Sequence, residues 1–208
     1  MNASLQEHFF KALEFYTTGD HYETLLEAKK EYFTITGQAN DDDDDFEARM
    51  NSFNEWYVLQ FISKRGTRTV ISDYLTTNQI NDLIAKSFTQ LNYSLFEFTG
   101  KNFRGVDVLY DMLHDKKISL PKNESLPSII KDDIFVGRIL SFEGNHYLLK
   151  GLTVIPKEVR SILKSECKKI RKLKNPNEEL KFLLKVEAFK TKWIRYGHVD
   201  ATKIFKFD

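Results

Sequence analysis

Five consecutive aspartates, Asp41 to Asp45, are the densest group of side chains in the sequence that could bind a cation. A calcium loop of the EF-hand type needs carboxylates at positions 1, 3 and 5, glycine at position 6 and glutamate at position 12. A loop that starts at Asp41 has Phe46 at position 6 and Ser52 at position 12. Because both essential residues are missing, the run predicts a helix start, with Asp44 or Asp45 capping backbone amides. Weak divalent-cation binding and an acidic docking surface are the alternatives.

The other reactive side chains form no recognisable catalytic or metal-binding pattern. None of the five histidines has the spacing of a zinc motif. Cys167 falls on the apolar face of a predicted helix, where a thiol is most simply a small core residue. Glu55 has no obvious acid–base partner, and no Walker loop, dinucleotide fingerprint or nucleophile elbow is present. We therefore expect no cofactor and no metal ion, and an enzyme only if the fold assembles a composite site.

Basic side chains in the last quarter of the chain make one coherent candidate surface. From position 157 to 208 there are 15 lysines and arginines against 7 acidic residues, a net charge of +8, so the first 156 residues carry −7 of the total of +1. Such a surface could follow a phosphate backbone. Five of these cations are spaced by three and four residues and span an arc of roughly 80° on one side of a helix: Lys157, Arg160, Lys164, Lys168 and Arg171.

A second basic segment, 190–198, interleaves charge with aromatic rings. Its Lys192, Trp193, Arg195 and Tyr196 are compatible with base stacking. A charged outer face is also what any amphipathic helix needs, and Trp193 continues the apolar stripe of its own helix. The open alternatives are a solvated face, a partner in the acidic remainder of this chain or of a neighbour, a nucleic acid, and an acidic protein or membrane surface.

Helices at both ends of the chain and short strands between them must position these side chains. Capping signals and apolar spacing predict helices over the first 90 residues, the first of which begins at a capping box of Ser4 and Glu7. Another runs from about Asp45 to Ile62, and its apolar stripe is Phe46, Met50, Phe53 and Tyr57. Two further helices follow Pro156.

The middle of the chain reads as β-structure. Short runs rich in β-branched and aromatic residues alternate with turn residues between about Asn92 and Ile155. About five such strands predict a small, strongly bent antiparallel sheet or barrel. The sequence therefore predicts an α+β fold with a helical region (1–90), a β-barrel-like region (91–156) and a basic helical region (157–208), which could together form one compact domain.

Composition describes a globular chain rather than a disordered one. Of 208 residues 41% are hydrophobic, with 17 phenylalanines and only 4 prolines. No apolar run approaches the roughly 18 residues that span a bilayer. The first residues form an acidic amphipathic helix rather than a signal peptide, and a single cysteine excludes an internal disulfide. We expect a cytoplasmic protein.

Four stretches of the sequence resemble motifs of an uncharacterised bacterial protein family. They are FNEWY (53–57), SLFEF (94–98), LYDML (109–113) and DDIFVGRIL (132–140). The family patterns are F-x-E-W-[FY], S-L-F-E-[FV], L-x-D-[LM]-L and G-D-x-x-x-x-R-[IL]-L. The last match departs at its first position, where Asp132 replaces the glycine. The resemblance spans roughly residues 46–170 and implies a helix-then-β organisation, with no established activity and no catalytic residue to transfer.

Three functional hypotheses follow in order of preference. The first is a non-enzymatic interaction or adaptor protein of the bacterial cytoplasm, with an unidentified protein partner. The second is a nucleic-acid-associated protein that uses the basic C-terminal helix stripe. The third is an enzyme with a composite site. The sequence leaves the oligomeric state open.

Overall fold

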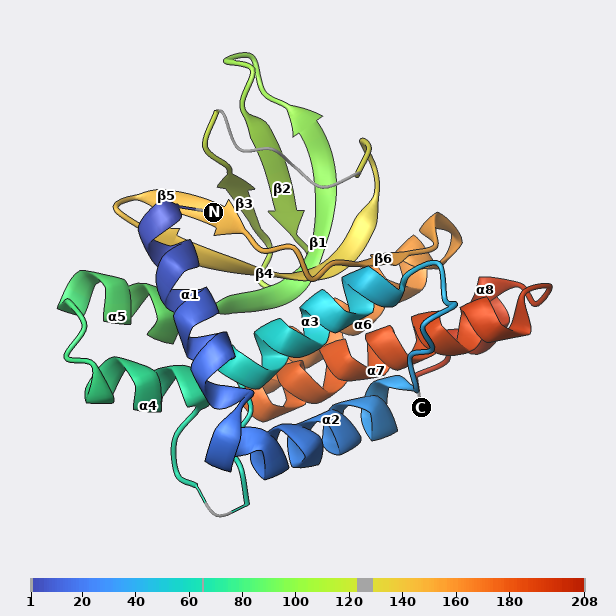
Figure 1. Ribbon diagram of the computed structural model, residues 1–208. Helices are drawn as coiled ribbons and strands as arrows, with labels where there is room; N and C mark the ends of the chain where they lie inside the picture. The colour runs from blue at the N-terminus through green and yellow to red at the C-terminus, as the bar shows by residue number, and fades with distance from the viewer. Residues whose placement is uncertain (1, 65, 123–128, 208) are drawn as a thin grey trace.

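The computed structural model describes residues 2–64, 66–122 and 129–207, and every structural statement below concerns these ranges. A curled sheet lies on a layer of helices (Figure 1). The helices are α1 (Ala3–Tyr16), α2 (Tyr22–Thr36), α3 (Phe46–Leu59), α4 (Val70–Thr77), α5 (Asp82–Thr89), α6 (Arg160–Leu173), α7 (Pro176–Tyr196) and α8 (Ala201–Ile204), with short 3-10 turns at Gly19–His21 and Lys157–Val159. The strands are β1 (Asn92–Lys101), β2 (Asp107–Asp111), β3 (Lys116–Ser119), β4 (Ile134–Phe142), β5 (Asn145–Leu148) and β6 (Thr153–Ile155).

The sheet is antiparallel throughout, in the order β3-β2-β1-β4-β5. β6 pairs with the first residues of β4, while β5 pairs with its last residues, so one long strand serves two short ones. β1 changes register between Phe98 and Gly100, an irregularity that increases strand twist and bending. The predicted α+β fold with a small bent sheet between helical regions is confirmed.

The third predicted helix is confirmed, with different ends. Phe53 and Tyr57 of its apolar stripe are buried in α3. α3 stops at Leu59 rather than at Ile62, and the next residue, Gln60, has left helical geometry. The capping box at the first helix is wrong: the side chain of Asn2, not of Ser4, caps α1, because its Oδ1 accepts from the Ser4 amide at 2.9 Å.

Three apolar clusters fill the interior. One lies among α1–α5 and includes Leu140 and Leu149 next to the sheet and Leu184 of α7. Another joins the sheet to α6, α7 and α8, and the third fills the concave side of the sheet around Phe96 and Phe135. Side chains from the regions 1–90, 91–156 and 157–208 thus share cores. Among the described helices, none has the length and apolarity that crossing a membrane requires.

Candidate functional site

The basic stripe lies along the turn Lys157–Val159 and α6, but much of its charge is already paired. Lys157 Nζ lies 3.1 Å from Asp133 Oδ1. The Arg160 guanidinium donates from Nε and Nη2 to the two oxygens of Glu97, at 3.0 and 2.9 Å. Bidentate pairing of this kind is the strongest geometry available to arginine. These two cations therefore hold the start of α6 to the sheet.

Arg171 holds the turn between β2 and β3. Its Nε donates to the Leu113 carbonyl at 2.7 Å and its Nη2 to the Met112 carbonyl at 2.9 Å. Its Nη1 lies 2.6 Å from Asp115 Oδ2. A guanidinium occupied on three sides has little capacity left for an external polyanion, so the role of Arg171 in this structure is internal.

Arg171→Ala is expected to lower the free energy of unfolding by about 2 kcal/mol, because hydrogen bonds to charged groups contribute roughly 1.5–3 kcal/mol. Chemical denaturation followed by circular dichroism measures the change. Lys168→Ala removes a cation of the same helix and is the matched control, expected within about 0.5 kcal/mol of the unsubstituted protein. Equal denaturation midpoints for the two variants would contradict the internal role.

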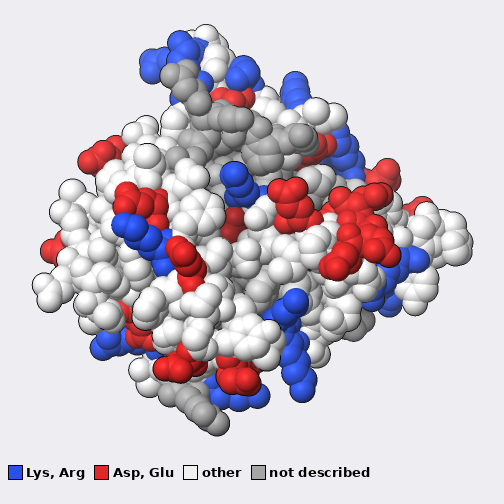
Figure 2. All heavy atoms as spheres, in the orientation of Figure 1, with Lys and Arg blue, Asp and Glu red and all other residues white. Residues whose placement is uncertain are grey.

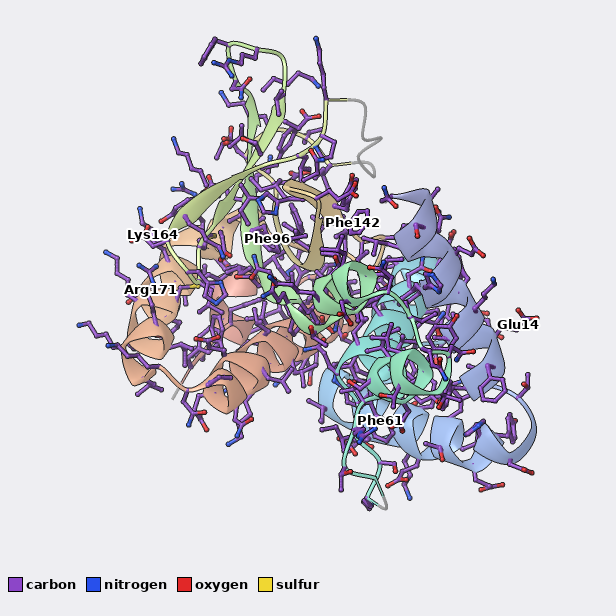
Figure 3. The ribbon with its side chains drawn as sticks, turned by 90° about the vertical axis from the view of Figure 1, so that its left-hand side faces the viewer. Glu14, Phe61, Phe96, Phe142, Lys164 and Arg171 are labelled. Atoms are coloured by element: carbon purple, nitrogen blue, oxygen red, sulfur yellow. The ribbon has the colours of Figure 1, made fainter. Side chains whose placement is uncertain are left out.

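Lys164 and Lys168 are the two stripe residues for which the described part of the chain provides no ion pair. Both are exposed. Figure 3 shows Lys164 and Arg171 along one outer edge of α6, on the opposite side of the molecule from Glu14 of α1. The five aligned cations of the stripe are therefore three internally bonded residues and two that face solvent.

The second basic segment divides in a different way. Lys192, Arg195 and Tyr196 line a groove of about 440 Å³ between the C-terminal ends of α2 and α7. Trp193 does not line the groove. It is half-buried against the apolar cluster that joins the sheet to α6, α7 and α8, and its Nε1 donates to the Val199 carbonyl at 3.1 Å. The indole is therefore part of the core and not of a stacking surface. The groove lining is completed by Thr34, Ile35, Gly37, Ala188 and Thr191.

Gly37 allows the two helices to meet at this groove. Its φ is +89°, which ends α2 in a conformation that favours glycine. A Cβ at this position would lie 2.7 Å from the Thr191 Cγ2 of α7. The carbonyl of the next residue, Gln38, accepts from Arg195 Nη2 at 2.6 Å and from Arg49 Nη1 at 2.6 Å. Backbone carbonyls at the end of α2 thus fix both arginines.

The aspartate run forms the segment before α3, as expected, but it does not cap the helix through a side chain. Asp45 occupies the N-cap position without a side-chain hydrogen bond to the helix, and its Oδ2 lies 3.8 Å from Lys190 Nζ of α7. Asp43 accepts from the Asn40 amide at 2.9 Å and lies 3.8 Å from Arg49. Among the described residues, no group of three or more His, Cys, Asp or Glu side chains has an arrangement that could hold a metal ion, here or elsewhere.

The residues in this run that make no ion pair with another described residue are Asp41, Asp42 and Asp44, and all three are exposed. Figure 2 shows the acidic side chains gathered at the right of the view, with basic side chains at their lower border. The run is therefore an acidic surface beside the basic groove, with only Asp43 and Asp45 engaged within the chain.

A buried polar cluster, which the sequence did not predict, joins the sheet to the helices. Its centre is Arg138 of β4, whose side chain is 0% exposed. Arg138 donates to Gln60 Oε1 at 2.8 Å and to Ser52 Oγ at 3.1 Å, and its guanidinium carbon lies 4.1 Å from the ring centre of Tyr93. The cluster also includes Tyr32 of α2, Glu55 of α3 and Glu187 of α7.

Two buried tyrosines hold the carboxylate of Glu187. The Tyr93 hydroxyl donates to Glu187 Oε1 at 2.8 Å, and the Tyr32 hydroxyl donates to Oε2. Burial raises the pKa of both phenols well above the usual value, so both keep the proton that they donate. A charge-assisted network of this kind rigidifies the contact between α2, β1 and α7.

Glu55 faces the same arginine from α3. Its Oε1 accepts from the Gly151 amide at 2.6 Å, and its Oε2 lies 3.7 Å from Arg138 Nη1. A Cβ on Gly151 would lie 2.6 Å from the Ser52 backbone, so only glycine permits this approach. Burial raises the pKa of Glu55 to about 7, although the Arg138 charge and the amides of Gly151 and Lys150 act in the opposite direction.

Two atoms of this cluster remain without a hydrogen-bond partner. They are Glu55 Oε2 and Arg138 Nη2, both buried. Glu55 and Arg138 lie in two of the sequence stretches that carry the family resemblance, FNEWY and DDIFVGRIL. That shared placement is the one signal in the sequence that could have paired them. The side chains of the cluster are buried and join α2, α3, β1, β4 and α7.

A second polar cluster contains the residue types of a catalytic triad, Ser94, Asp111 and His114, but not in the order that a triad requires. Asp111 accepts from the Ser94 hydroxyl, and its Oδ2 lies 2.9 Å from His114 Nδ1. The other ring nitrogen lies 3.4 Å from Glu179 of α7. In a triad the histidine contacts the serine hydroxyl; here that hydroxyl is bonded to the aspartate, so the imidazole has no nucleophile to activate.

The thiol of Cys167 is buried in the apolar cluster between the sheet and helices α6, α7 and α8, as the sequence predicted. Burial raises its pKa to about 12, which keeps it protonated and unreactive. Three charged surface features of the described structure bear on a partner: the basic groove between α2 and α7, the acidic run Asp41–Asp45 beside it, and the exposed pair Lys164 and Lys168.

Three comparisons with known proteins found no match. No protein-family model matches this chain, no curated protein is significantly similar to its sequence, and no solved structure matches its fold.

Proposed function

We propose that this chain is a non-enzymatic interaction protein of the bacterial cytoplasm that binds an acidic segment of a protein partner in the groove between α2 and α7. The observation that carries the proposal is the composition of the groove lining, which contains Lys192 and Arg195 and no carboxylate. The bacterial cytoplasm belongs to the proposal because four short stretches of the sequence resemble motifs of an uncharacterised bacterial family and because the single thiol is buried.

The groove combines charge with exposed apolar surface, as protein interfaces do. Ile35 is 43% exposed and Tyr196 is 50% exposed, and both line the groove beside the cations. Tyrosine and arginine are enriched among residues that dominate binding energy. Arg195 uses one N–H on the Gln38 carbonyl, and a guanidinium has five donors, so it retains donors for a carboxylate.

Association with nucleic acid is the second proposal, and it rests on Lys164 and Lys168. These two cations lie one helical turn apart and face solvent, so they could contact neighbouring phosphates. The internal bonds of Arg160 and Arg171 leave this surface smaller than the five-residue stripe. Two phosphate contacts give weak binding with a shallow salt dependence, which ranks this proposal below the groove.

A photo-crosslinking amino acid at Ile35, introduced at native expression level, tests both proposals in one experiment. We expect a crosslinked product that resists nuclease, is lost in K192E/R195E and persists in K164E/K168E. The second variant makes the same change of charge at exposed positions of α6 and is the matched control. Equal crosslinking in K192E/R195E and the control would refute the groove proposal.

The same two variants decide the nucleic-acid proposal with a separate readout. Binding to a fluorescein-labelled 20-nucleotide single strand is measured by anisotropy at low salt. The nucleic-acid proposal requires that K164E/K168E weaken this binding at least about tenfold, which corresponds to the loss of about 1.4 kcal/mol. Unchanged binding in that variant would exclude Lys164 and Lys168 as phosphate contacts.

A further inference from the structure

We propose that the chain forms a two-fold dimer in which the run Asp41–Asp45 of each copy lies against the α2–α7 groove of the other. This inference rests on the proposed function, because it uses the same groove and names a second copy as the partner. It also explains why five carboxylates precede a helix whose capping uses none of their side chains.

The acidic run and the basic groove are neighbours on one face of the molecule. Gly37 lines the groove, and the run begins four residues later. Asp45 reaches Lys190 of α7 at 3.8 Å. Asp43 lies 3.8 Å from Arg49, which donates to the same Gln38 carbonyl as Arg195 of the groove. Figure 2 shows acidic and basic side chains next to each other at the right of the view, where Figure 1 places the segment before α3. Together with the contacts above, this places the two patches of opposite sign side by side rather than on separate faces.

The charges of both patches are incompletely matched within one chain. Asp41, Asp42 and Asp44 make no ion pair with any described residue, and Lys192 makes none either. Arg195 donates to a carbonyl and not to a carboxylate. The two ion pairs that the run does make have N–O distances of 3.8 Å, at the long end for such contacts. Carboxylates and cations thus remain available to a second molecule.

A two-fold axis between adjacent patches of opposite sign brings each onto its complement. Interfaces of this symmetry use the same surface on both copies, so the surface must be complementary to itself. A basic groove beside an acidic run meets that requirement without any other partner. A single-sign surface would repel its own copy, which is why adjacency, and not charge alone, points to a second copy.

Exposed apolar side chains lie beside the groove as well. Ile35, Ile194 and Tyr196 are 43%, 41% and 50% exposed. Ile35 lies in the last turn of α2, and the other two lie in the last turn of α7. Their burial between two copies would add an apolar centre to a charged rim, the usual arrangement of a protein interface.

Sedimentation equilibrium of the full chain tests the dimer. We expect dimerisation that weakens about tenfold between roughly 0.05 M and 0.5 M salt, because exposed charge pairs are screened over this range. D41K/D42K/D44K and K192E/R195E are each expected to be monomeric. In each variant the run and the groove carry charge of the same sign, so two copies repel each other at this surface. The K164E/K168E variant is the control and keeps the dimer; circular dichroism checks that all variants are folded.

Mixing the two monomeric variants provides the decisive result. In a mixed pair the basic run of one copy meets the acidic groove of the other, and the unchanged run meets the unchanged groove. A heterodimer should therefore form in the mixture although neither variant self-associates. A mixture that stays monomeric, or an unsubstituted protein that is monomeric at low salt, overturns the inference.

Failure of the dimer and failure of the groove proposal give different results. If the unsubstituted chain is monomeric and the Ile35 crosslink still depends on Lys192 and Arg195, the groove binds another protein and only the dimer is wrong. If the crosslinked product has twice the mass of the chain, the partner is a second copy. If neither crosslink nor dimer responds to the groove variant, both are wrong.

Discussion

Arg138→Ala is expected to lower the free energy of unfolding by about 3–5 kcal/mol, a larger loss than that expected for Arg171→Ala. The guanidinium is fully buried, and it faces the carboxyl groups of Glu55 and Glu187. Removing it leaves these groups in the core without a cation, which costs more than the loss of the pair itself. Urea denaturation followed by circular dichroism measures the change.

Arg160→Ala is the matched control for this substitution. It also removes an arginine paired with a glutamate, but at a half-exposed position, where water reaches the charge that remains and the expected loss is smaller, about 1–2 kcal/mol. If the two variants shift the denaturation midpoint equally, the buried cluster does not have the role assigned to it. The double variant R138M/E55Q should recover part of the loss, because it removes charge on both sides of the pair.

The second large effect is on the pH dependence of stability. The folded pKa of Glu55 is about 7, against an ordinary value of 4.5. A raised pKa means that the folded protein holds this proton more tightly than the unfolded chain does. The contribution of protonated Glu55 to the stability of the fold is therefore fully present below about pH 4.5 and is lost as the pH rises through about 7.

Glu55→Gln removes this titration while keeping a neutral side chain of the same shape. Between pH 4.5 and pH 8, the free energy of unfolding of the unsubstituted protein is expected to fall by about 3 kcal/mol relative to that of this variant. The groups that face Glu55 are Arg138, Glu187 and the amides of Lys150 and Gly151. Urea unfolding at several pH values measures both curves, and parallel curves would show that Glu55 does not titrate in this range.

Another group titrates in a nearby range and must be separated from Glu55. A hydrogen bond to Asp111 raises the pKa of His114, and the Glu179 carboxylate acts in the same direction. The stability that His114 contributes is therefore also lost as the pH rises through its folded pKa. Both proteins carry this histidine, so the difference between their two curves isolates Glu55.

Local patterns in the sequence predicted the elements, because helical and strand periodicities are local properties. Phe53 and Tyr57 of the stripe are buried in α3, and Phe46 and Met50 are half-buried, because residues at this spacing share one face of a helix. The short runs rich in β-branched and aromatic residues from position 92 onwards became strands because such residues favour strands. The capping prediction at Ser4 was wrong because Asn2, two residues earlier, provides an equally good acceptor.

Local patterns in the sequence did not reveal which cations of the basic stripe are bonded within the chain. Periodicity correctly placed Arg160 and Arg171 on one side of a helix. It could not show that Glu97 and the β2–β3 turn would lie opposite them, because these partners are more than 55 positions away in the chain. The same limit separates Trp193, which packs into a core, from Tyr196, which lines the groove.

The buried cluster around Arg138 also has a consequence for the rate of folding. Its contacts join residues 86, 94, 96 and 155 positions apart in the chain. Contacts between such distant positions slow folding, since the entropy of closing long loops is lost before the contact forms. Arg138 cannot meet its carboxylates until α2, α3, the sheet and α7 have come together. We therefore expect the ionic centre to form late, so that the final collapse of the chain is a single cooperative step that excludes stable partial assemblies.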